Sequence, residues 1–204
     1  MRHVAIVVFD DVEVLDFCGP FEVFAVCGRR SGDAPFEVHT IAESERPVFA
    51  RHRLSVNPTF TFKSADAPRA DIVLVPGGFG TRREMRNPAM IDWVQRANEN
   101  AELLLSVCTG SLILGAAGLL DDLDATTHFA AYEELRTAAP ACRVRPDMRY
   151  VDTGRLITSA GVSAGIDMAL HVVARLHGDD VAQETARYME YEGRYALAER
   201  EPIS

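Results

Sequence analysis

The chain alternates short, mostly apolar runs typical of strands with segments whose apolar residues recur at helical spacing. The apolar runs are HVAIVVF (3–9), FEVHTIA (36–42), DIVLVPGG (71–78) and ELLLSV (102–107). They lack the apolar–polar alternation of strands with one solvated face, so both faces of each strand must be covered. Strands interleaved with helices in this way predict an α/β fold, with a mostly parallel sheet between two helical layers. Ligands of such sheets bind beyond the carboxyl ends of the strands.

Local signals predict the remaining elements. Asn87 and Pro88 are typical of the first residues of a helix, and a helix is also expected near Pro20. Further helices are expected over 109–120, 132–139 and 165–178, and from Asp179 or Asp180 to about Tyr191. Shorter strands are expected in 47–60, over 125–129, and as a pair within 149–161 that turns at Thr153-Gly154.

Length and charge limit the classes of function. The 204 residues predict a single domain over 1–204, and the net charge of −9 argues against a nucleic-acid partner. No apolar run is long enough for a signal peptide or a membrane span, which predicts a cytoplasmic protein without a membrane partner. Four cysteines without CxxC, scattered histidines and the lack of GxGxxG predict free thiols, with no metal and no cofactor.

Cys108 lies where a strand-like run meets a helix-like run. Ser106-Val107-Cys108-Thr109-Gly110 places small residues on both sides of a potential nucleophile, which is the layout of a nucleophile elbow. A cysteine at a helix N-terminus is also expected to ionise more easily. The alternative is a buried structural cysteine, the commoner fate of a cytosolic thiol. The spacing favours an exposed, activated nucleophile.

Three other strand ends carry candidate site residues. Gly77 and Gly78 could direct backbone N–H groups at an oxyanion, or form an ordinary turn. Asp16 lies among apolar neighbours, so it is either an acid–base group with a raised pKa or a helix cap. His128 ends the expected strand 125–129, and it either faces the site or is a satisfied, half-buried histidine.

Four segments taken together resemble the ThiJ/PfpI superfamily, whose fold is that of class I glutamine amidotransferases. They are LDFCGPFEVF, VPGGFG, LLSVCTGSLILGAAGLLDDLDATTHF and LITSAGVSAGIDMALHVVA. The resemblance implies a flavodoxin-like three-layer sandwich, commonly a homodimer. It also implies that Cys108 is the elbow nucleophile, with an acid from the first strand–helix connection near its sulfur.

Within that superfamily the sequence is most similar to isonitrile hydratases. The LDxxGP context of Asp16, the threonine after the nucleophile and AGxxAGID at 160–167 carry this similarity. It implies hydration of a small isonitrile to an N-substituted formamide, with Cys108, Asp16 and Thr109 in catalysis. Thr109 is expected to hold the water or the carboxylate. Gly77, Gly78, the Cys108 backbone and His128 are expected to line the substrate and oxyanion pocket.

Two alternatives remain open. Another enzyme of the superfamily, such as a glyoxalase, deglycase or amidase, would need a general base, and Asp16 or His128 could supply it. Thr109 replaces the histidine that usually follows the nucleophile in those branches, which excludes a Cys–His dyad there. The other alternative is a non-catalytic thiol or redox sensor. A transcription regulator is not expected, because no helix-turn-helix region follows the domain.

Overall fold

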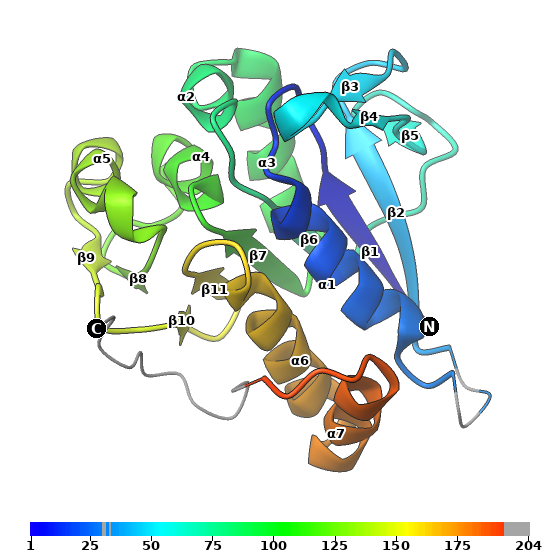
Figure 1. Ribbon diagram of the computed structural model, residues 1–204. Helices are drawn as coiled ribbons and strands as arrows, with labels where there is room; N and C mark the ends of the chain where they lie inside the picture. The colour runs from blue at the N-terminus through cyan, green and yellow to red at the C-terminus, as the bar shows by residue number, and fades with distance from the viewer. Residues whose placement is uncertain (30–31, 33, 194–204) are drawn as a thin grey trace.

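A computed structural model describes residues 1–29, 32 and 34–193 and contains a seven-stranded central sheet (Figure 1). Its strands are β1 (Arg2–Val7), β2 (Phe36–Ala42), β5 (Phe60–Thr61), β6 (Ile72–Val75), β7 (Leu103–Val107), β10 (Tyr150–Asp152) and β11 (Leu156–Ser159). They lie in the order β10-β11-β7-β6-β1-β2-β5. Every neighbouring pair is parallel except β10 and β11. The predicted α/β fold with a mostly parallel sheet is therefore confirmed.

Helices cover both faces of this sheet. The layer in front in Figure 1 contains α1 (Val14–Val26), α6 (Ala164–His177) and α7 (Asp179–Tyr188). The other helices are α2 (Thr81–Glu84), α3 (Pro88–Asn100), α4 (Gly110–Ala116) and α5 (Tyr132–Ala138), of which α3 lies behind the sheet. Two small pairs of strands complete the described part, β3 (Val48–Phe49) with β4 (Ser55–Val56) and β8 (Asp124–Ala125) with β9 (Arg143–Val144).

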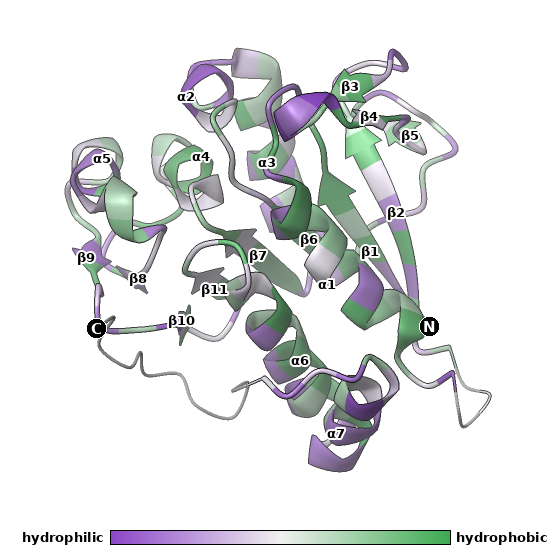
Figure 2. Ribbon diagram, in the orientation of Figure 1, coloured by the Kyte–Doolittle hydropathy of each residue, from purple (hydrophilic) through white to green (hydrophobic). Residues whose placement is uncertain are grey.

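The central strands form the core. Every residue of β6 and β7 is buried, as continuous apolar runs covered on both faces require. Figure 2 shows these strands in the hydrophobic colour and the outer helix α7 as largely hydrophilic. Helix α3 begins as predicted, because the Asn87 side chain accepts a hydrogen bond from Ala89 N (3.1 Å) with Pro88 in the first position.

Helix α1 is the helix expected near Pro20. It begins at Val14, six residues before Pro20, and contains Pro20 in its interior. Proline is disfavoured there because it has no N–H and its ring crowds the preceding turn. Close packing against α6 explains its position: a Cβ on Gly19 would lie 2.8 Å from Ile166 Cγ1, and the Pro20 ring is close to Gly165. Tertiary contacts thus override the local preference of Pro20.

Two local predictions were wrong. The strand expected over 125–129 ends at Ala125, and His128 precedes a short 3-10 helix over Phe129–Ala131. After Ala125 the backbone bonds to a side chain instead of to a neighbouring strand, since Thr126 N donates a hydrogen bond to Thr158 Oγ1 (2.9 Å). Neither Asp179 nor Asp180 caps the last helix, which follows Gly178 (φ 94°) and ends at Tyr188.

No helix among the described residues has the length and apolar character needed to cross a membrane. The single-domain prediction for 1–204 includes residues 194–204, which lie outside the described part of the chain.

Candidate active site

Cys108 occupies the sharp turn between β7 and α4. Its φ of 57° lies in the left-handed region, which is strained for a residue with a side chain. Gly110 follows because a Cβ there would lie 2.0 Å from the Val75 carbonyl oxygen. The nucleophile elbow predicted from the spacing is therefore present.

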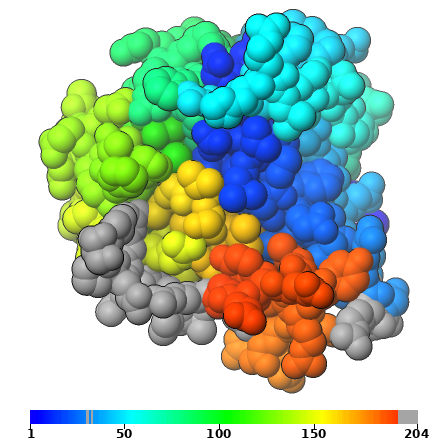
Figure 3. Space-filling model, viewed as in Figure 1, coloured from blue at the N-terminus to red at the C-terminus, as the bar shows by residue number. Residues whose placement is uncertain are grey.

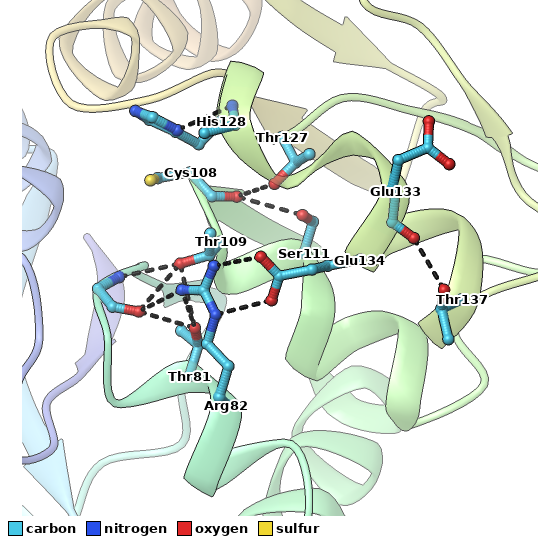
Figure 4. A network of polar contacts seen from close by, with 12 residues as sticks. Thr81, Arg82, Cys108, Thr109, Ser111, Thr127, His128, Glu133, Glu134 and Thr137 are labelled. Carbon is cyan, nitrogen blue, oxygen red and sulfur yellow. Dashed lines mark hydrogen bonds and ion pairs between the residues drawn. The ribbon is translucent and has the colours of Figure 1, made fainter.

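Four hydrogen bonds hold the strained Cys108 backbone. Its N–H donates to the carbonyls of Ser159 and Ala160, both at 3.1 Å. Its carbonyl accepts from Ser111 Oγ (3.1 Å) and Thr127 Oγ1 (2.9 Å), as Figure 4 shows. Thr127, which was expected within the strand 125–129, therefore stabilises the turn at Cys108 through its side chain.

Asp16 lies in the first turn of α1, fully buried beside Cys108. Its Oδ2 accepts a hydrogen bond from Gly77 N (3.0 Å), and the buried Oδ1 has no hydrogen-bond partner among the described residues. Burial raises the pKa of this carboxyl from 3.8 to about 7, although the neighbouring Cys108 and Gly77 favour its ionised form. The helix cap is Glu13, so the raised-pKa interpretation of Asp16 agrees with the structure and the capping interpretation does not.

The Cys108 thiol is not the exposed, activated thiolate that we expected. The residue is only 5% exposed, and burial together with the charge of Asp16 raises its pKa. The favourable dipole of the seven-residue helix α4 does not compensate for lost solvation. Two anions cannot share this buried site, so the pair holds at least one proton near neutral pH.

Gly77 and Gly78 do not provide the expected oxyanion donors. The Gly77 N–H is bound to Asp16, and the Gly78 N–H donates to Thr109 Oγ1 (3.0 Å). The Cys108 N–H is also bound, as described above. Gly77 has a different role: its missing Cβ would lie 2.6 Å from Thr109 N and 2.7 Å from Asp16 Oδ2. This glycine lets the nucleophile and the acid approach each other.

Thr109 also differs from expectation. Its hydroxyl bonds to the Gly78 peptide rather than to Asp16, and it accepts a further hydrogen bond from Thr81 Oγ1 (3.1 Å). Thr109 therefore fixes the glycine loop beside the elbow. Its N–H and hydroxyl also lie near the Cys108 sulfur and favour the thiolate.

An arginine that the sequence analysis missed extends this network. Arg82 donates to Gly78 O (3.1 Å) and forms a two-pronged ion pair with Glu134 at 2.8 and 2.7 Å (Figure 4). The pair ties α2, which follows the glycine loop, to α5, which follows His128. No sequence signal could identify it, because the two residues lie far apart in the chain.

His128 is half-buried on the same side of the elbow as the Cys108 sulfur (Figure 4). Its Nδ1 accepts a hydrogen bond from Ala130 N (3.2 Å), and its ring packs against Gly161, where a Cβ would lie 2.3 Å from Cδ2. Figure 3 shows the 158–166 segment (yellow) at the surface between α1 (blue) and the segment that carries His128. The structure thus brings Asp16, Gly77, Gly78 and Thr109 together around Cys108 and leaves His128 at the edge.

Exposed apolar side chains adjoin the site residues along the chain. Leu15, Phe79, Phe129 and Val162 are 38%, 68%, 59% and 37% exposed. They neighbour Asp16, Gly78, His128 and Gly161. Arg51 lies over the Phe79 ring, 4.3 Å from its centroid. Across residues 1–29, 32 and 34–193, no cluster of three or more His, Cys, Asp or Glu side chains could hold a metal.

Comparisons with known proteins identify relatives of the chain. A model of the DJ-1/PfpI family matches residues 2–175. Isonitrile hydratase from Pseudomonas putida is 37% identical over 189 residues, which cover 93% of this chain and 78% of that protein. The HTH-type transcriptional regulator CdhR from Pseudomonas aeruginosa is 31% identical over 85% of this chain, which spans only 50% of the regulator. A solved structure of a ThiJ/PfpI family protein from Pseudomonas syringae has a TM-score of 0.83 and 31% identity, covering 95% of this chain and 76% of that one.

Proposed function

Because the chain belongs to the DJ-1/PfpI family, we propose that it is a cysteine-dependent hydratase that converts an isonitrile into an N-substituted formamide. The 37% identity to isonitrile hydratase supports this activity. One observation carries the proposal: the buried Asp16 carboxyl, with a pKa of about 7, lies against the Cys108 thiol. Such a pair can move one proton back and forth between a nucleophile and a reacting carbon.

The first step is addition of the thiol across the terminal carbon of the isonitrile. The raised pKa of Cys108 keeps the proton on sulfur until an electrophile arrives. Asp16 takes that proton as the sulfur–carbon bond forms and passes it to the same carbon. The product is a thioimidate, R–N=CH–S–Cys108, and both atoms of the S–H bond have been added to the substrate.

Water completes the reaction. Asp16, again ionised, accepts a proton from the water that attacks the thioimidate carbon and passes it to the nitrogen, which gives the tetrahedral intermediate R–NH–CH(OH)–S–Cys108. Asp16 then takes the remaining hydroxyl proton as the C=O bond forms and delivers it to sulfur as the C–S bond breaks, which releases the formamide. Overall one water is consumed, and the enzyme regains its starting protonation state.

The surroundings of the site favour a neutral, apolar substrate. The reacting thiol and carboxyl are almost fully buried, so an ionised group beside them would lose its hydration without a counter-ion. Exposed Phe79 and Phe129 offer aromatic surface for the substituent of the isonitrile. We therefore propose alkyl and aryl isonitriles as the substrate class.

Formation of N-cyclohexylformamide from cyclohexyl isonitrile, followed by mass spectrometry, tests this proposal. We expect turnover by the wild type, and a loss of at least about 10³-fold in Cys108→Ala and Asp16→Asn. Cys142→Ala is the matched control, because Cys142 is another partly buried thiol with a pKa raised by burial. We also expect a covalent adduct on Cys108 whose mass equals that of the intact isonitrile. Absence of both formamide and adduct would reject the hydratase assignment.

Other activities of the scaffold receive less support. A redox-sensing thiol needs an accessible thiolate, whereas Cys108 is buried and its pKa is raised. A glyoxalase or deglycase would use the same two groups, with Asp16 as its base. Methylglyoxal is therefore the second compound to assay with the same variants.

A further inference from the structure

A cavity to which none of the candidate active-site residues contributes lies on the face of the sheet covered by α3. It has a volume of about 420 Å³, within the range of small-molecule sites. Its floor is formed by β1 and β2, and its walls by α3 and the segment 61–70. In the sheet, β6 and β1 separate this floor strand β2 from β7, which carries the elbow (Figure 1). The cavity is therefore distinct from the candidate active site.

His39 lies on the floor of this cavity. The residue is 5% exposed, and neither ring nitrogen has a hydrogen-bond partner among the described residues. Its neighbour across the strands is Ala5, and its ring packs edge-on against Phe60, with ring centroids 5.1 Å apart. An unpaired buried polar group costs about 1–3 kcal/mol. Both nitrogens are shielded from solvent, so they gain hydrogen-bond partners only if the ring turns toward a ligand in the cavity.

The charge of the lining selects the kind of ligand. Arg69 and Arg96 line the cavity, and no aspartate or glutamate does, although the whole chain has a net charge of −9. Neither guanidinium forms an ion pair within the described part of the chain; Arg69 donates to the carbonyl of Asn100 (2.8 Å). Two unpaired guanidinium groups above a floor without negative charge favour an anion.

The walls favour a flat ring. Trp93 and Phe62 line the cavity as a stacked pair, with ring centroids 4.8 Å apart and planes 14° apart. Trp93 and Arg96 are one helical turn apart on α3, so their side chains lie on the same face. An apolar ring beside Trp93 would therefore lie next to the guanidinium of Arg96.

We propose that this cavity is a second ligand site, which binds a small aromatic carboxylate. The ring packs against Trp93, the carboxylate faces Arg69 and Arg96, and a polar substituent forms hydrogen bonds with His39. Burial lowers the pKa of His39, so its neutral ring offers one donor and one acceptor to that substituent. The site does not depend on the chemistry of Cys108.

Trp93 makes this site observable, because it is the single tryptophan of the chain. The full-length protein is labelled with ¹⁵N, and the indole N–H resonance is followed while 4-hydroxybenzoate is added to 5 mM. We expect saturable shifts with a dissociation constant below about 1 mM. The neutral analogue 4-hydroxybenzamide should bind at least about tenfold more weakly. The Cys108→Ala variant should bind equally well, which keeps the result independent of the hydratase proposal.

Arg96→Gln and His39→Leu should each raise the dissociation constant at least about fivefold. Arg86→Gln should not, because Arg86 is an exposed arginine that does not line this cavity. Arg96 is exposed, so its variant keeps the test valid even if His39→Leu fails to fold. Three results would each overturn the proposal: no shift of the indole resonance, equal binding of the amide, or unchanged affinity in Arg96→Gln.

Discussion

Ionisation of the buried Asp16 carboxyl is expected to lower the stability of the folded protein. Its pKa is 3.8 when solvated and about 7 when buried beside Cys108. Between these two values the unfolded chain ionises Asp16 while the folded chain retains the proton, so stability falls as the pH rises through this window. Above pH 7 the whole penalty is present, and below pH 4 it is nearly absent. At 1.36 kcal/mol per pH unit the penalty is about 4 kcal/mol.

Asp16→Asn removes this penalty, because the amide has the same shape and cannot ionise. Its oxygen can still accept from Gly77 N, as Oδ2 does in the wild type. The buried NH₂ group needs a partner, so we expect a net gain of about 2–4 kcal/mol at pH 8. For a chain of this size that corresponds to a rise in melting temperature of roughly 5–15 °C. The same variant should lose catalysis.

Urea unfolding at pH 4, 6 and 8 measures this effect. The difference in unfolding free energy between Asp16→Asn and wild type should be largest at pH 8 and fall below about 1 kcal/mol at pH 4. Asp92→Asn changes an exposed carboxyl on α3 and serves as the surface control. If Asp16→Asn is no more stable than the wild type at pH 8, or if the difference in their unfolding free energies does not change with pH, burial does not hold the proton on Asp16.

Three further substitutions test the architecture of the site. Gly77→Ala places a Cβ 2.6 Å from Thr109 N, so formamide production should fall at least about 100-fold, measured in the isonitrile assay. Thr109→Val leaves the Gly78 N–H unpaired and should cost about 1–3 kcal/mol in urea unfolding, whereas Thr109→Ser should restore most of that loss. Glu134→Gln weakens the ion pair with Arg82. Because the pair is partly exposed, we expect the free energy of unfolding to fall by under about 1 kcal/mol, and kcat to fall by a larger factor than KM changes.

Much of the fold follows from local patterns. Mostly apolar runs predict the strands of the central sheet, and 36–42 is a strand over that whole range. The small residues around Cys108 predict the elbow, because only they tolerate the tight turn between β7 and α4. The turn at Thr153-Gly154 and the start of α3 at Pro88 are likewise local signals with local causes.

The failures of prediction share one physical reason. The strand expected over 125–129 ends at Ala125, because the backbone N–H of Thr126 is bound by the side chain of Thr158 from a distant strand. The Gly77 and Gly78 N–H groups are natural oxyanion donors in isolation, yet side chains from distant segments already bind them. In each case a contact between residues far apart in the chain outweighs the preference of the local segment.

The sequence by itself determined the layers of the fold and the tight turn at Cys108, and with family resemblance it pointed to Asp16 as the neighbouring acid, since these depend on short-range patterns and on that resemblance. Only the tertiary structure decided how the two groups behave. Burial sets the pKa values of Asp16 and Cys108, and burial is a property of the packed chain rather than of a segment. The cavity above His39 is likewise a product of the tertiary structure. Its charged lining and the unpaired His39 nitrogens come together only where β1, β2 and α3 meet.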